Sequence, residues 1–71
     1  MPRLEAAYKR AADTHERAAA THDRAALQFD RVGKHELADR ERERARVDRA
    51  GAVMDRERAR LRRERTAARQ S

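Results

Sequence analysis

The sequence predicts an all-α protein, an antiparallel two-helix hairpin of the coiled-coil type that self-associates into a helical bundle. Three observations support this prediction. The helix formers Ala, Arg and Glu dominate a chain of 71 residues that contains one Pro and two Gly. The first half of the chain repeats every seven residues, as coiled-coil helices do. A glycine follows this repeat at the point where a helix would end.

The repeat consists of four consecutive segments, YKRAADT, HERAAAT, HDRAALQ and FDRVGKH. A ring side chain opens each segment, arginine stands third, and a small apolar residue stands fourth. Repetition every seven residues places the first and fourth positions on one face of a helix. Alanine on that face lets a neighbouring helix approach closely. We therefore expect a helix over about residues 3–31 with these residues in a protein interface: Leu4, Tyr8, Ala11, His15, Ala18, His22, Ala25 and Phe29.

A turn is predicted at residues 32–35. Gly33 suits the left-handed residue that ends many helices, and Lys34 adds a cation at the negative helix end. A second helix is expected over about residues 36–68. Because a connection this short joins antiparallel helices, residues 1–71 are expected to form one helical hairpin and a single domain.

The second helix is more polar, and its larger apolar residues recur at Val47, Met54 and Leu61. We expect these three residues and Ala68, helped by Leu37, Ala50, Gly51 and Val53, to form its side of the seam. Folding the chain at the turn would place Val47 near Ala19 and Met54 near Ala12. Large residues would then meet small ones, as interdigitating packing requires.

Gly51 is costly in a helix interior, by about 1 kcal/mol. The same folding places it opposite His15, so a close crossing of the helices is one reason for a glycine. The competing interpretation is a helix break at Gly51, which would give three helices.

The alanine-rich face of the first helix is wider than one partner helix can cover. At this length a single core seldom supplies more than about 3–5 kcal/mol without disulfides, metal or oligomerisation. We therefore expect a homo-oligomer, most simply a dimer that forms a four-helix bundle, or a complex with another helical protein.

His15 and His22 occupy positions where leucine is expected. They lie about 10.5 Å apart along the helix, too far for both to bind one metal ion. A half-polar layer that fixes register is the favoured interpretation, with hydrogen bonds to Thr14, Thr21 or the other arm. In that case leucine at both histidines would strengthen assembly or change its order. Loosening of the seam by acid remains a second hypothesis.

Much of the net charge of +6 lies near the C-terminus. Arginine-rich helix ends bind phosphates through charge, without discrimination of sequence. No aromatic residue lies among these arginines, so base stacking is not expected. The residues that would contact nucleic acid or another acidic partner are Arg58, Arg60, Arg62, Arg63, Arg65 and Arg69.

The chain offers little chemistry for catalysis. It contains no cysteine and no glycine-rich phosphate loop, and its serine is the last residue. We expect no enzyme activity, cofactor, metal, small-molecule substrate or membrane attachment. The N-terminus is charged from its third residue, so we expect no signal peptide and a cytoplasmic location.

The block HERAAATHDRAALQFDRVGKHELADRERERA resembles short Ala/Arg-rich heptad-repeat proteins of high-GC bacteria, of the actinobacterial type. The resemblance spans residues 8–50 and rests on the His-acid-Arg-Ala-Ala repeat and the Gly33 turn. It implies a bacterial, cytoplasmic, helical protein and transfers no activity. The sequence thus predicts a non-catalytic interaction module, a small regulator or adaptor. The alternative is a small basic protein that binds nucleic acid.

Overall fold

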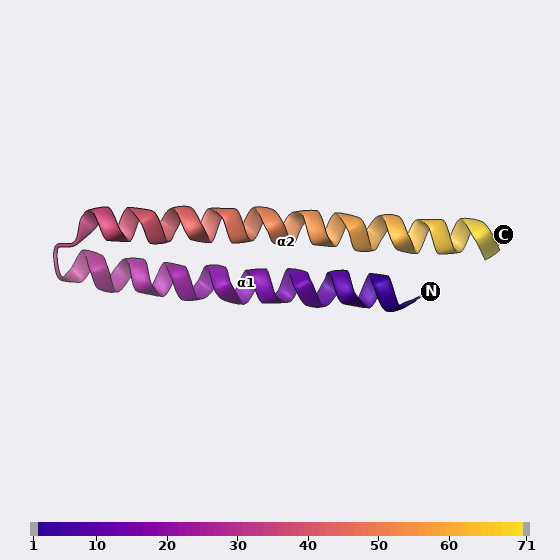
Figure 1. Ribbon diagram of the computed structural model, residues 1–71, viewed down its shortest axis with the longest axis horizontal. Helices are drawn as coiled ribbons and strands as arrows, with labels where there is room; N and C mark the ends of the chain where they lie inside the picture. Colours follow the sequence, from indigo (N-terminus) through magenta and orange to yellow (C-terminus); the bar gives the residue numbers. More distant parts are fainter. Residues whose placement is uncertain (1, 71) are drawn as a thin grey trace.

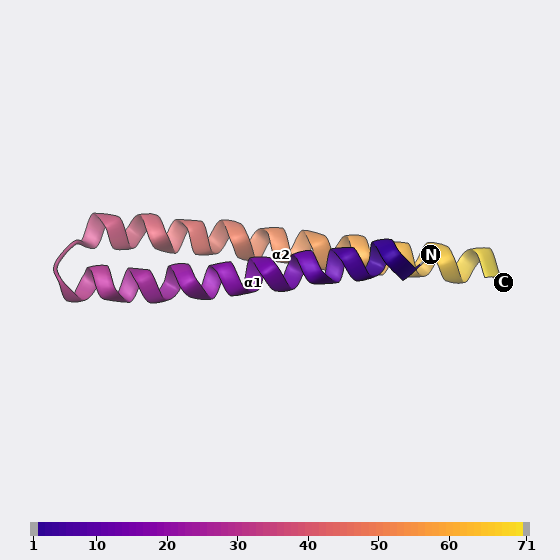
Figure 2. The same cartoon turned by 60° about the horizontal axis from the view of Figure 1, so that its bottom comes forward.

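Two antiparallel helices form a straight hairpin in the computed structural model, which describes residues 2–70 and the side chains of residues 3–70. Helix α1 is Pro2–Arg31 and helix α2 is His35–Gln70. The helices lie side by side along their length, and α2 continues past the start of α1 (Figures 1 and 2). The rod measures 58 × 13 × 9 Å. The predicted hairpin is confirmed, with helix bounds that differ from the prediction by one or two residues.

The turn at residues 32–34 has the hydrogen bonds that are common where a helix ends at a glycine. Gly33 has a positive φ of 76°, which favours glycine. Its N–H donates to the Asp30 carbonyl at 3.1 Å, and the Lys34 N–H donates to the Phe29 carbonyl at 2.8 Å. The Lys34 carbonyl then accepts from the Ala38 N–H at 3.1 Å, which starts α2. The prediction that Gly33 ends the first helix is confirmed.

Alanine alone forms the buried apolar core of the described chain. The buried residues recur every seven positions along both helices, so each set occupies one side of its helix. We call them the alanine row, and they are Ala12, Ala19 and Ala26 on α1 with Ala38, Ala45, Ala52 and Ala59 on α2. Because its side chain is a single methyl group, alanine lets the facing helix approach more closely than a larger residue would. The same residue type has the highest helix propensity.

The predicted seam of the second helix is wrong. Val47 is 63% exposed and Met54 is 55% exposed, so neither packs against the alanines of α1. Leu61 is 43% exposed. The repeat of large apolar residues is real, but it lies on a side of α2 that does not face α1.

Gly51 lies in the interior of α2, so the alternative of three helices is wrong. A Cβ atom at this position would lie 3.1 Å from Nε2 of His15. This spacing confirms the predicted meeting of His15 and Gly51. Because the missing methyl group gives the imidazole its space, glycine is tolerated here despite its cost in a helix.

Neither helix, over the residues described, combines the length and apolarity needed to cross a membrane.

Candidate interaction surfaces

Two polar rows flank the alanine row on opposite sides. On α1, His15 follows Ala12 by three residues and Glu16 follows it by four, so the two side chains lie on either side of Ala12. Seven-residue spacing repeats this arrangement along the helix. One flank therefore carries imidazoles and the other carries carboxylates.

The first flank is an imidazole–carboxylate row in which α1 supplies the rings and α2 the acids. Nδ1 of His22 lies 2.6 Å from Oε2 of Glu41, and Nε2 lies 3.5 Å from Oδ2 of Asp48. Nδ1 of His15 lies 3.0 Å from Oδ1 of Asp48, and Nε2 lies 3.6 Å from Oδ2 of Asp55. The order along the seam is therefore Glu41, His22, Asp48, His15, Asp55. Asp48 joins both rings, and Asp55 is the one polar residue buried among those described.

This row refines the sequence-based interpretation of the histidines. A half-polar layer with a bond to the other arm is confirmed, while Thr14 and Thr21 bond instead to backbone carbonyls of their own helix. Each ring lies between two carboxylates of α2. Within residues 3–70, no group of three or more His, Asp or Glu side chains is placed to hold a metal ion.

The second flank is a guanidinium–carboxylate row that also joins the two helices. Its three ion pairs follow the seven-residue spacing of both helices: Asp30–Arg42, Asp23–Arg49 and Glu16–Arg56. Asp30 also accepts from His35 at the turn, with 2.7 Å between Oδ1 and Nδ1. Sequence reasoning missed this row, although the acids at the second position of the repeat were visible.

The arginines lower the pKa values of the acids that they contact. The hydrogen bond from Arg49 lowers the pKa of Asp23 below its ordinary value of 3.8. Bonds from Arg42 and then His35 lower the pKa of Asp30. On α2, the bond from Arg60 lowers the pKa of Glu57. All three carboxylates are therefore better stabilised as anions in the folded chain than in the unfolded chain.

The direction of these shifts predicts how stability depends on pH. Because the folded pKa values are depressed, the stabilisation is complete above the ordinary values of 3.8 and 4.5, and it is lost as the pH falls through the folded values. We expect urea denaturation followed by circular dichroism to give a free energy of unfolding that declines below about pH 4. A D23N/D30N variant should be less stable at neutral pH and show a shallower decline. An equally steep decline in that variant would contradict the assignment.

The α1 residues predicted for a protein interface lie on the side of the hairpin that carries the imidazole row. Ala11, Ala18 and Ala25 are half-buried and lie three or four residues from the rings of α1, which places them on the same side. Met54 and Val47 have the same relation to Gly51 on α2. We call this side the apolar face: Leu4, Tyr8, Ala11, His15, Ala18, His22, Ala25, Phe29, Val47, Gly51, Met54 and Leu61. The structure thus places His15 and His22 in the seam between the helices, the other predicted residues of α1 on the same side, and Val47, Met54 and Leu61 at its edge on α2.

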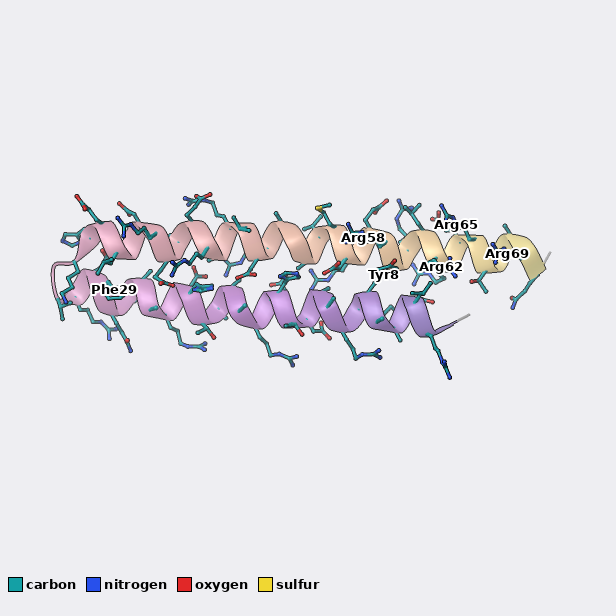
Figure 3. The ribbon with its side chains drawn as sticks, in the orientation of Figure 1. Tyr8, Phe29, Arg58, Arg62, Arg65 and Arg69 are labelled. Carbon is teal, nitrogen blue, oxygen red and sulfur yellow. The ribbon has the colours of Figure 1, made fainter. Side chains whose placement is uncertain are left out.

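Four of the six C-terminal arginines lie along one side of α2, and Arg60 and Arg63 do not. Arg58, Arg62, Arg65 and Arg69 follow one side of α2, and Tyr8 of α1 lies between the helices nearby (Figure 3). A hollow at this place is lined by Tyr8, Arg58, Leu61, Arg62 and Arg65.

The C-terminal arginines also differ in their ion pairs. Arg60 is paired with Glu57 and Glu64. Arg58 lies 3.2 Å from Asp55, and Arg63 lies 3.9 Å from Glu5. Arg62, Arg65 and Arg69 have no carboxylate partner among residues 3–70.

A scan against models of protein families finds no match, and searches of curated proteins and of solved structures find none.

Proposed function

We propose that the chain is a non-catalytic interaction module, a small regulator or adaptor that acts through a helical interface on its apolar face, and that a second copy of the chain occupies this face. The supporting observation is that the core contains alanine only. The larger aliphatic side chains of the described chain are exposed to solvent: Leu4, Leu27, Val32, Leu37, Val47, Val53, Met54 and Leu61. A hairpin of this size gains little from burying alanine methyls. Association would add the missing apolar burial.

The apolar face suits close approach of another helix pair. Ala11, Ala18 and Ala25 on α1 and Gly51 on α2 supply short side chains on either side of the imidazole–carboxylate row. Val47, Met54 and Leu61 form its rim on α2. Small residues at the centre and larger ones at the rim favour two interlocking layers of helices.

Charge favours a second copy in an antiparallel arrangement. Along α2, positions spaced by seven on the side of the imidazole row carry acids at Glu41, Asp48 and Asp55, then arginines at Arg62 and Arg69. An α2 helix reversed about residue 55 would bring Arg62 to Asp48 of the second copy and Arg69 to Glu41. Because a two-fold axis relates the two copies, each of these contacts between an arginine and an acid forms twice.

Light scattering after size exclusion tests the association. We expect about twice the chain mass of 8.3 kDa. Ala18 and Ala20 provide a matched pair, because both are half-buried on α1 but lie on opposite sides of the alanine row. Ala18→Arg should weaken the dimer at least about tenfold, because it places a charge on the apolar face, while Ala20→Arg should leave it intact. A helical monomer at every accessible concentration, or equal weakening by both variants, would overturn the proposal.

Single cysteines test the orientation, because the natural chain contains none. Met54→Cys lies next to the proposed two-fold axis and should form an intermolecular disulfide by itself. Val47→Cys and Leu61→Cys should do so efficiently only when the two variants are mixed. Equal cross-linking of each variant with itself would indicate parallel α2 helices and contradict the proposed arrangement.

A further inference from the structure

Five arginines form a second surface on the outer side of α1. They occupy the third position of the repeat and are spaced by seven residues: Arg3, Arg10, Arg17, Arg24 and Arg31. We call them the outer arginine row. All five are exposed. Figure 3 shows side chains with nitrogen at their tips extending at even intervals from the side of α1 that faces away from α2.

The ion pairs of the hairpin leave this row unneutralised. Glu16, Asp23 and Asp30 of α1 are directed toward arginines of α2. Of the outer arginine row, only Arg24 has a side-chain hydrogen bond within residues 3–70, to the Thr21 hydroxyl at 3.2 Å, and none of the five has a carboxylate partner there. Asp13 lies three residues after Arg10 and four before Arg17, and it forms no ion pair with either. By contrast, Arg46 and Arg60 on the exposed part of α2 are each paired with acids of their own helix.

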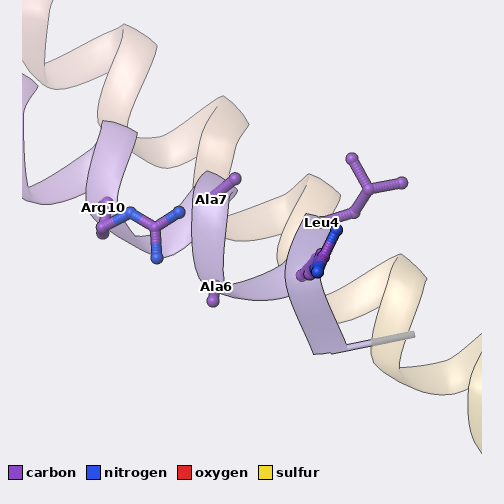
Figure 4. Close-up of a pocket in the computed structure, with 5 residues that line it drawn as sticks. Leu4, Ala6, Ala7 and Arg10 are labelled. Atoms are coloured by element: carbon purple, nitrogen blue, oxygen red, sulfur yellow. The ribbon is translucent and has the colours of Figure 1, made fainter.

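The row is straight, and most of the side chains beside it are short. Successive arginines lie about 10.5 Å apart, and the whole row is about 42 Å long at 1.5 Å per residue. A hollow between its first two members is lined by Arg3, Leu4, Ala6, Ala7 and Arg10 (Figure 4). Because Ala6 and Ala7 carry only methyl groups, a long anionic ligand could approach the helix between the guanidinium groups.

We propose that the outer arginine row binds the phosphate backbone of double-stranded nucleic acid without reading its sequence. A guanidinium group presents paired N–H donors that match phosphate oxygens. A duplex is a stiff rod with about one negative charge per 1.7 Å, so a straight row of cations can contact it repeatedly. The row contains no aromatic side chain, and single strands are commonly held by stacking on aromatic residues. The large apolar residues near the row are Leu4, Leu27 and Val32, which are well separated along the chain and include no aromatic, and this disfavours insertion into a lipid surface.

This surface is independent of the proposed self-association. The outer arginine row and the apolar face lie on different sides of α1, so a dimer would leave two rows exposed. The sequence alone assigns nucleic-acid contact to the C-terminal arginines instead. Substitution of the outer arginine row and substitution of the C-terminal arginines therefore distinguish the two assignments, because each predicts that a different variant loses binding.

Fluorescence anisotropy with a labelled DNA duplex of mixed sequence, at about 50 to 200 mM salt, tests the proposal on the full chain. We expect binding at low salt. The logarithm of the binding constant should fall linearly with the logarithm of the salt concentration, with a slope of about 0.9 per phosphate contacted. R17Q/R24Q should weaken binding at least about tenfold and reduce this slope by nearly 2. The control R46Q/R60Q removes the same charge from paired arginines and should retain both affinity and slope. R65Q/R69Q tests the C-terminal alternative and should behave as the control.

Several outcomes would overturn the proposal. These are no binding at the lowest salt concentration, equal loss in all three variants, and loss confined to R65Q/R69Q. Tighter binding to vesicles of anionic lipid than to the duplex would assign the row to membranes instead. R17Q/R24Q should elute with the same mass as the natural chain, so a failure of this proposal is separable from a failure of self-association.

Discussion

Ala45→Leu is expected to lower the free energy of unfolding by about 1–3 kcal/mol. Ala45 is fully buried in the alanine row at the contact between the two helices. A leucine at this position adds three carbons where the helices are close, so they must separate or tilt. Separation would also lengthen the contacts of both flanking polar rows. Because a hairpin of this size holds only about 3–5 kcal/mol, the loss removes a large part of its stability.

Urea denaturation followed by circular dichroism measures this effect. Ala50→Leu is the matched control, because it makes the same change five residues along α2 at an exposed position. Its effect should stay within about 0.5 kcal/mol, as for most surface substitutions. Unfolding of both variants at the same urea concentration would show that the alanine row is not the closest contact of the hairpin.

The hairpin itself was predictable because its signals are local. Helix formers throughout, a seven-residue repeat and Gly33 are each read from a short window of sequence, and they agree with one another. The meeting of His15 and Gly51 followed from counting residues outward from the turn. A glycine in a helix interior indicated close approach, because its cost needs a compensating contact.

The buried side of α2 was not predictable by searching for large apolar residues. That search selects Val47, Met54 and Leu61, whereas the structure buries Ala38, Ala45, Ala52 and Ala59. In a closely spaced helix pair, small size rather than hydrophobicity decides which residue fits between the backbones. A seven-residue alanine repeat in α2 matching that of α1 was the available signal.

The acids of the seam were missed for a different reason. Almost every acid of α2 has an arginine three or four residues away, so pairing within the helix was the obvious interpretation. Asp55 does bond to Arg58 at 3.2 Å, and Glu41 bonds to Arg44 at 2.9 Å. Each of these carboxylates also faces an imidazole of α1. Only the register of the two helices reveals this second partner.

His22→Leu is expected to destabilise the hairpin by about 1–3 kcal/mol, the usual cost of leaving a buried acceptor unpaired. The heptad repeat alone suggests the opposite, since leucine at a seam position normally strengthens assembly. However, His22 is held between Glu41 and Asp48, whose side chains are only 14% and 20% exposed. Leucine would leave Oε2 of Glu41 without its imidazole partner, while Oε1 keeps Arg44, and it would bring apolar carbon against both carboxylates. Urea denaturation at neutral pH measures the effect.

Two further variants separate loss of the partner from loss of the ring. His35→Leu makes the same change at an exposed turn position, where Asp30 keeps Arg42 as a partner, and it should cost less than about 0.5 kcal/mol. Glu41→Gln in the His22→Leu background removes the charge that lost its donor, so it should cost less there than in the natural chain. A His22→Leu variant that is more stable than the natural protein would mean that the carboxylates are satisfied by water, and that the imidazole row contributes nothing to the stability of the folded chain.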